Sequence, residues 1–101
     1  MPRREEVVLS EYKIFETDEF QKQLKKITSS KRKVVEKKLS EYVYPQLKSA
    51  PCYGPNIKKL KGYEPETWRY RIGNYRVFYT MDNEEPIVYI LTVDDRKDAY
   101  K

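Results

Sequence analysis

The 101-residue sequence contains no histidine, and this absence excludes much of the chemistry available to a small protein. General acid–base catalysis by an imidazole is impossible, and most zinc sites lose their usual nitrogen ligand. The single cysteine, Cys52, cannot form an intrachain disulfide and has no histidine to activate it as a nucleophile. We therefore interpret Cys52 as a passive residue, and we expect a cytoplasmic protein with no metal or other cofactor.

Glycine and long apolar runs are also scarce. The three glycines, Gly54, Gly62 and Gly73, are too scattered to form a Gly-rich phosphate-binding loop. No apolar run approaches the roughly 20 residues that a membrane span needs, and no signal-peptide segment is apparent. We expect a protein without a membrane partner, organised as one domain over 1–101 with residues 1–10 as a flexible arm.

Basic charge and tyrosine are abundant instead. Lys and Arg total 21 against 16 Asp and Glu, which gives a formal net charge of +5, and there are ten tyrosines. This combination favours an anionic partner, and nucleic acid is the first candidate. A well-solvated surface has the same composition, and we interpret the lysine-rich face of the second predicted helix in this way.

Hydrophobic periodicity predicts a short strand and two amphipathic helices in the N-terminal half. We expect the strand near 11–16, followed by Thr17 as the N-cap of the first helix. "TSS" at 28–30 is expected to end this helix and to cap the second. The second helix should kink at Pro45 rather than end there, because its apolar pattern continues to Leu47. The two apolar stripes are Phe20, Leu24 and Ile27, and then Val34, Val35, Leu39, Tyr42, Val43 and Leu47.

From residue 51 onward the sequence is typical of turns and strands. Runs 67–72, 75–81 and 86–93 have strand composition, and 57–60 reads as a short extended piece. The resulting order is β-α-α-β-β-β. It predicts an α+β fold in which two N-terminal helices pack on one face of a mainly antiparallel four-stranded sheet.

Three arginines are crowded into "WRYRIGNYRVFY", residues 68–79. Gly73 followed by Asn74 predicts a two-residue type II′ hairpin turn, which places Arg71 directly opposite Arg76. Side chains alternate between the two faces of a strand, so the tryptophan, tyrosines and valine of this segment are expected to face the helices. The other face then carries Arg69, Arg71, Arg76 and Phe78.

Like charges directly opposite each other destabilise an antiparallel pair by up to about 1 kcal/mol. A face with such a pair is expected to hold an anion, and the guanidinium fork suits phosphate in particular. The alternative is that Asp94, Asp95 or Glu64 folds over this face and neutralises the arginines.

These segments together resemble the RelE/ParE superfamily of toxins from type II toxin–antitoxin modules, and the RelE-type mRNA endonucleases most closely. The resemblance begins near Tyr12 and rests on "FQKQLKKI", "KKLKG", "WRYRIGNYRVFY" and "YILTVDDRKDAY" in this order. It implies metal-independent cleavage of mRNA in the ribosomal A site, and hence inhibition of translation. It also implies a cognate antitoxin, so that the chain would be a monomer or part of a toxin–antitoxin hetero-oligomer.

The resemblance further implies roles for individual residues in an attack of the substrate 2′-OH on the adjacent phosphate. Arg71 and Arg76 would bind the phosphate, and Arg69 would support them. Arg96 would serve the leaving group. Tyr100 would orient the substrate or act as the base, because deprotonating an arginine near neutral pH costs roughly 7 kcal/mol. Outside this catalytic set, RNA contacts are expected from Lys59, Lys61 and Phe78, of which Phe78 is equally consistent with packing.

Two alternatives remain open at this point. A ParE-like toxin has the same scaffold but binds and poisons DNA gyrase without nuclease chemistry. An inactive relative would bind RNA or an antitoxin and no longer cut. The sequence gives no codon preference and does not identify the antitoxin.

Overall fold

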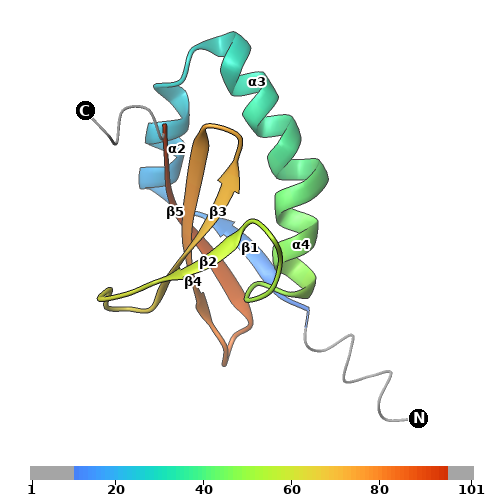
Figure 1. Ribbon diagram of the computed structural model, residues 1–101, viewed down its shortest axis with the longest axis vertical. Helices are drawn as coiled ribbons and strands as arrows, with labels where there is room; N and C mark the ends of the chain where they lie inside the picture. The colour runs from blue at the N-terminus through green and yellow to red at the C-terminus, as the bar shows by residue number, and fades with distance from the viewer. Residues whose placement is uncertain (1–10, 96–101) are drawn as a thin grey trace.

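The computed structural model describes residues 11–95, which form one mixed sheet with helices on one of its faces (Figure 1). The strand order across the sheet is β1-β5-β4-β3-β2. In chain order the elements are β1 (Lys13–Glu16), α2 (Asp18–Lys25), α3 (Ser29–Lys38), the π-helical segment η1 (Leu39–Val43), α4 (Tyr44–Ser49), β2 (Ile57–Leu60), β3 (Thr67–Ile72), β4 (Tyr75–Asp82) and β5 (Ile87–Asp95). Over these residues, no helix has the length and apolar character that crossing a membrane requires.

The sheet has five strands, so the prediction of four was wrong by one strand. The segment 57–60 is paired with β3 along its whole length. Its sequence, "IKKL", lacks the alternation of a half-buried strand, which is why composition alone indicated only an extended piece. The mainly antiparallel character is confirmed, with the exception of β1, which runs parallel to β5.

Thr17 caps α2 as predicted and also ties this helix to the sheet. Its side-chain oxygen accepts a hydrogen bond from the backbone N–H of Phe20 at 3.2 Å. The same hydroxyl donates to the carbonyl of Ile90 in β5 at 2.7 Å. Thr28 takes the N-cap position of α3 but makes no side-chain capping bond, so the second predicted cap is present in position only.

The second helical segment is continuous through Pro45, as predicted, but it contains a π-helical stretch that the sequence reading missed. Its buried residues recur every four positions, at Val35, Leu39, Val43 and Leu47. In a regular α-helix, four residues turn through about 400°, which is about 40° more than one full turn. Residues spaced by four therefore move around the helix axis by about 40° at each repeat. The wider turns of η1 offset part of this rotation, and Leu47 stays fully buried. The π stretch includes Glu41, whose carbonyl the ring of Pro45 would crowd in a regular α-helix.

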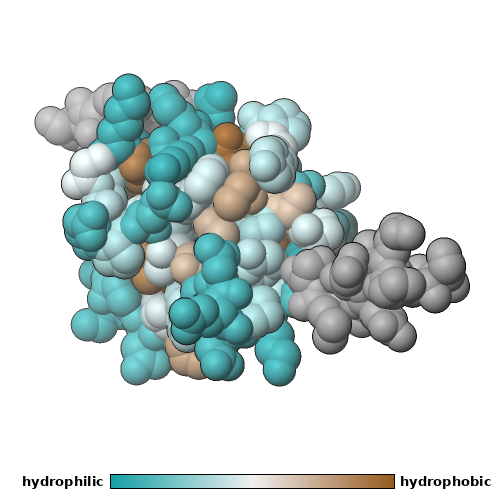
Figure 2. Space-filling model, turned by 90° about the horizontal axis from the view of Figure 1, so that it is seen from below, coloured by the Kyte–Doolittle hydropathy of each residue, from teal (hydrophilic) through white to brown (hydrophobic). Residues whose placement is uncertain are grey.

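The hydrophobic core lies between these helices and the facing side of the sheet. Val34 and Tyr42 are not part of it, since they are 56% and 62% exposed. From the strands, the core receives Tyr70, Ile72, Val77, Tyr79, Val88, Ile90 and Val93. Among residues 11–95, no helix covers the opposite face of the sheet (Figure 1). At the end seen from below, the surface is mainly hydrophilic, in keeping with the 37% charged residues of the sequence (Figure 2).

Candidate functional site

The β3–β4 hairpin has the predicted turn and register. Gly73 has a φ of +56°, and Asn74 has no positive φ, which is the combination found in a type II′ turn. All five predicted pairs are present, and Arg71 is the cross-strand partner of Arg76. The strand alternation therefore places Arg69, Arg71, Arg76 and Phe78 on the uncovered face of the sheet.

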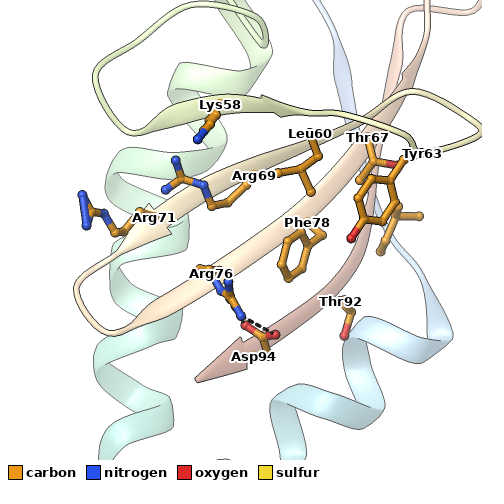
Figure 3. A pocket seen from close by; sticks show the side chains of 11 residues that line it. Lys58, Leu60, Tyr63, Thr67, Arg69, Arg71, Arg76, Phe78, Thr92 and Asp94 are labelled. Carbon is orange, nitrogen blue, oxygen red and sulfur yellow. Dashed lines mark hydrogen bonds and ion pairs between the residues drawn. The ribbon is translucent and has the colours of Figure 1, made fainter. Parts of the chain in front are cut away.

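A groove of about 720 Å³ runs across this face, over β2, β3, β4 and β5 (Figure 3). One end carries four cationic side chains, from Lys58, Arg69, Arg71 and Arg76. The other end is formed by the apolar and aromatic side chains of Leu60, Tyr63 and Phe78, with Thr92 beside them. The groove thus has a charged half and an aromatic half.

Arg76 lies between a cation and an anion. Arg71 is its cross-strand partner on β3, and Asp94 is its partner on β5. The Nε and Nη2 atoms of Arg76 donate to Oδ1 and Oδ2 of Asp94, each at 3.1 Å. Its guanidinium carbon also lies 5.5 Å from the centre of the Phe78 ring, within the range of a cation–π contact.

The alternative in which a carboxylate neutralises the arginines is therefore correct for Arg76 and not for Arg71. Asp94 is the residue responsible. Arg71 is exposed, and within residues 11–95 no carboxylate forms an ion pair with it. One strong cation of the groove is held in place, and its neighbour is available to an incoming anion.

Asp94 reaches this face because of a β-bulge. The register between β4 and β5 shifts between Phe78 and Tyr79, which leaves Leu91 as an extra residue in β5. In an unbroken strand, Asp94 would point to the same face as Ile90, which is fully buried in the core. The extra residue reverses the alternation, and the carboxylate lies beside Arg76.

The two lysines that are predicted to contact RNA, Lys59 and Lys61, do not line the groove. Lys59 points away from the groove and pairs with Glu66 at 2.7 Å, where its ammonium lowers the pKa of the Glu66 carboxyl. Lys61 follows the end of β2 and does not line the groove. Lys58 does line it, as the cross-strand partner of Arg69. Sequence reasoning missed Lys58 because it did not pair 57–60 with β3, and that register is the signal that identifies it.

Tyr63 is a second groove residue that the sequence reading missed. It belongs to the connection between β2 and β3, is 56% exposed, and projects toward the end of the groove at which Phe78 lies (Figure 3). A turn-rich segment has no hydrophobic periodicity, so the local sequence does not indicate the direction in which the Tyr63 side chain points. The predicted residues Arg96 and Tyr100 lie outside the described residues.

Cys52 is half-buried, and its Sγ lies 3.8 Å from the Sδ of Met81. Burial raises the pKa of its thiol, and the negative charge of Glu66 raises it further. Both effects disfavour the thiolate, which is the reactive form of cysteine.

Comparison with known proteins gives a consistent family. The model of the family described as the ParE toxin of the type II toxin–antitoxin system parDE matches residues 14–100. A solved structure of the toxin–antitoxin complex RelBE2 from Mycobacterium tuberculosis matches with 28% identity and a TM-score of 0.67, over 85% of this chain and 92% of that chain. No curated protein matches the chain significantly.

Two archaeal structures are similar to a comparable degree. A RelB–RelE complex from Methanococcus jannaschii shares 26% identity with a TM-score of 0.59, over 85% of this chain and 94% of that chain. A RelE–RelB complex from Pyrococcus horikoshii has a TM-score of 0.62 over 84% of this chain and 94% of that chain. At 20% identity, the latter shares the fold alone.

Proposed function

Because the chain belongs to the RelE/ParE superfamily of type II toxins, we propose that it is a ribosome-dependent mRNA endoribonuclease that acts in the cytoplasm. It cleaves mRNA in the ribosomal A site and thereby inhibits translation. The observation that carries the proposal is the cationic half of the groove, in which Arg71 faces Arg76 and has no carboxylate partner within residues 11–95.

The electrostatics of the groove favour a phosphate as its ligand. Among residues 11–95, Asp94 forms its ion pair with Arg76, and no carboxylate forms an ion pair with Arg71. Opposed arginines cost stability in the free protein, and a bound phosphodiester removes this cost by charge-assisted hydrogen bonds to both forks. The volume of the groove lies within the usual range for small-ligand sites.

The two halves of the groove match the two parts of a nucleotide. A phosphate binds at the cationic end, and a base stacks at the aromatic end against Phe78 and Tyr63. Phe78 serves stacking and packing together, since the same ring contacts the guanidinium of Arg76.

The proposed reaction uses a nucleophile that the substrate itself supplies. The 2′-oxygen forms a bond to phosphorus while the bond to the 5′-oxygen breaks, leaving a 2′,3′-cyclic phosphate and a 5′-OH. One proton leaves the 2′-OH and one is added to the 5′-oxygen. Arg71 and Arg76 stabilise the dianionic phosphorane, and Arg69 and Lys58 hold the flanking backbone. In this proposal the reaction is metal-independent.

Proton transfer is assigned to residues beyond β5. Tyr100 is proposed as the orienting group or base, and Arg96 as the partner of the leaving oxygen. β5 ends at Asp95, next to Asp94 in the groove, and five extended residues span at most about 18 Å. Covalent geometry therefore allows Tyr100 to reach the bound phosphate. Lys59 and Lys61, outside the groove, are proposed to contact the backbone of rRNA or mRNA.

A cognate antitoxin is the other proposed partner. The matched structures from Mycobacterium tuberculosis and Methanococcus jannaschii are toxin–antitoxin complexes. We propose that this chain is neutralised in the same manner and exists free as a monomer or bound in a hetero-oligomer.

The second candidate function is that of a ParE-like toxin that binds DNA gyrase. The family match to the ParE toxin favours it. It makes no use of the opposed arginines for catalysis, which is why the nuclease is placed first.

One experiment separates the two functions. Purified protein that has been treated with EDTA and then desalted is added to ribosomes programmed with mRNA, and the ends are mapped by primer extension and tested for a 5′-OH. In parallel, gyrase supercoiling is measured with the same protein. We expect cleavage with 5′-OH ends and unchanged supercoiling. Inhibited supercoiling without cleavage would assign the ParE-like function instead, and cleavage that leaves 5′-phosphate ends would refute the proposed mechanism.

A further inference from the structure

We propose that Asp94 is a positioning residue that fixes the guanidinium of Arg76 so that the tip of its fork faces an anion in the groove. The inference rests on the proposed function only in identifying that anion as the phosphate of RNA. The geometry of the pair carries the rest.

The atoms that Asp94 occupies determine which donors remain. A guanidinium has five N–H donors, of which one is on Nε and two are on each terminal nitrogen. Asp94 takes the Nε donor and one Nη2 donor through its two carboxylate oxygens. Both donors on Nη1 and the second on Nη2 are left, and one donor from each of these nitrogens forms the tip of the fork. A phosphate can therefore bind Arg76 end-on without displacing the carboxylate.

The surroundings of Arg76 restrict its motion further. The Arg76 side chain is only 22% exposed, whereas that of Asp94 is 44% exposed. Phe78 contacts the guanidinium from another side. A donor held in place before the substrate arrives stabilises developing charge without reorganisation, which is the arrangement that favours the transition state over the ground state.

The negative charge of Asp94 also lowers the affinity of the groove for a phosphate. A carboxylate beside a phosphate site repels the ligand, and an unbroken β5 would keep it off this face. We therefore infer a division of roles between the arginines. Exposed Arg71 attracts and binds RNA, and Arg76, fixed by Asp94, acts on the reacting phosphate.

The test compares Asp94→Asn with Asp94→Glu and with Glu36→Gln, which removes one exposed acid on α3, across the sheet from the groove. If Asp94 positions Arg76, Asp94→Asn lowers kcat about tenfold, or about 1.4 kcal/mol, while KM stays equal or falls because a repulsive charge is gone. Asp94→Glu keeps the carboxylate and recovers part of kcat, and Glu36→Gln is unaffected. An increased kcat in Asp94→Asn would show that Asp94 only repels RNA. Equal losses in both Asp94 variants together with a lower Tm would show a purely structural role. Either result overturns the proposal.

A second measurement does not depend on cleavage. In ¹⁵N NMR spectra, a fixed guanidinium gives a protected Nε–H signal for Arg76 in the wild type, and this signal broadens in Asp94→Asn. Titration with a 2′-O-methyl RNA oligonucleotide, which cannot be cleaved, should shift the terminal nitrogens of Arg76 and leave the Nε signal in place. Loss of the Nε signal on binding would mean that phosphate displaces Asp94, and the proposal would fail. If the wild type binds in this way but never cleaves RNA, the nuclease function fails and the positioning of Arg76 stands.

Discussion

Replacing Arg71 by Gln tests whether the crowded arginines serve a ligand or the fold. The change removes one charge from the cationic half of the groove and keeps a side chain of similar length. In the free protein, Arg71 is exposed and is the cross-strand partner of Arg76. Its removal therefore relieves a repulsion and breaks no ion pair within residues 11–95.

The expected gain in stability is small because Asp94 already offsets the charge of Arg76. Opposed like charges cost up to about 1 kcal/mol, and a partly neutralised, exposed pair costs about half of that. A gain of about 0.5 kcal/mol corresponds to a rise in Tm of roughly 2–4 °C for a domain of this size. Thermal unfolding followed by circular dichroism measures this shift.

The expected loss of activity is much larger. A hydrogen bond between charged groups contributes about 1.5–3 kcal/mol, so cleavage on programmed ribosomes should fall at least about tenfold. Arg71→Lys keeps the charge but lacks the fork, and it should recover only part of the rate. Lys33→Gln on the exposed surface of α3 is the matched control, since it removes one positive charge from the far side of the sheet. An Arg71→Gln protein that melts lower and cleaves at the wild-type rate would refute the functional interpretation.

Two further variants test the remaining parts of the site. Deleting Tyr100 and Lys101 should abolish cleavage and toxicity while the Tm changes by less than about 2 °C, because chain ends contribute little to stability. Wild-type toxicity in this truncation would exclude Tyr100 from the mechanism. Tyr63→Ala should weaken binding of a short 2′-O-methyl RNA by about 1–3 kcal/mol through lost stacking, whereas Tyr63→Phe should bind normally. Equal affinities for all three proteins, measured by fluorescence anisotropy, would place the base elsewhere.

The parts of the fold that depend on local chemistry could be predicted from the sequence. The turn at Gly73 determines the register of the β3–β4 hairpin, and every pair follows from it by counting. The cap at Thr17 and the core faces of both strands have the same local origin. The opposition of Arg71 and Arg76 can therefore be predicted from the sequence alone.

Contacts between distant segments could not be predicted in this way. Lys58 enters the groove because β2 adds to the edge of β3, and the short sequence "IKKL" carries no alternation that would indicate such pairing. The side chain of Tyr63 projects into the groove because of the path of the β2–β3 connection, and this path depends on how β2 and β3 pack. The direction of the buried side chains in the second helical segment likewise depends on η1. This π-helical stretch reduces their rotation around the helix axis, and that rotation matters only when several turns pack on one sheet.

The bulge in β5 is recorded in the spacing of its buried residues, which the sequence alone does not show because Leu91 between them is apolar as well. Val88 and Ile90 are two residues apart, as in a regular strand, but the next buried residue, Val93, follows after three. A spacing of two and then three in a single strand requires one extra residue between Ile90 and Val93 if both are to face the core. The same extra residue moves Asp94 from the core face to the groove and sets it beside Arg76. The charge balance of the candidate site therefore depends on the spacing of the buried residues on the opposite face of the strand.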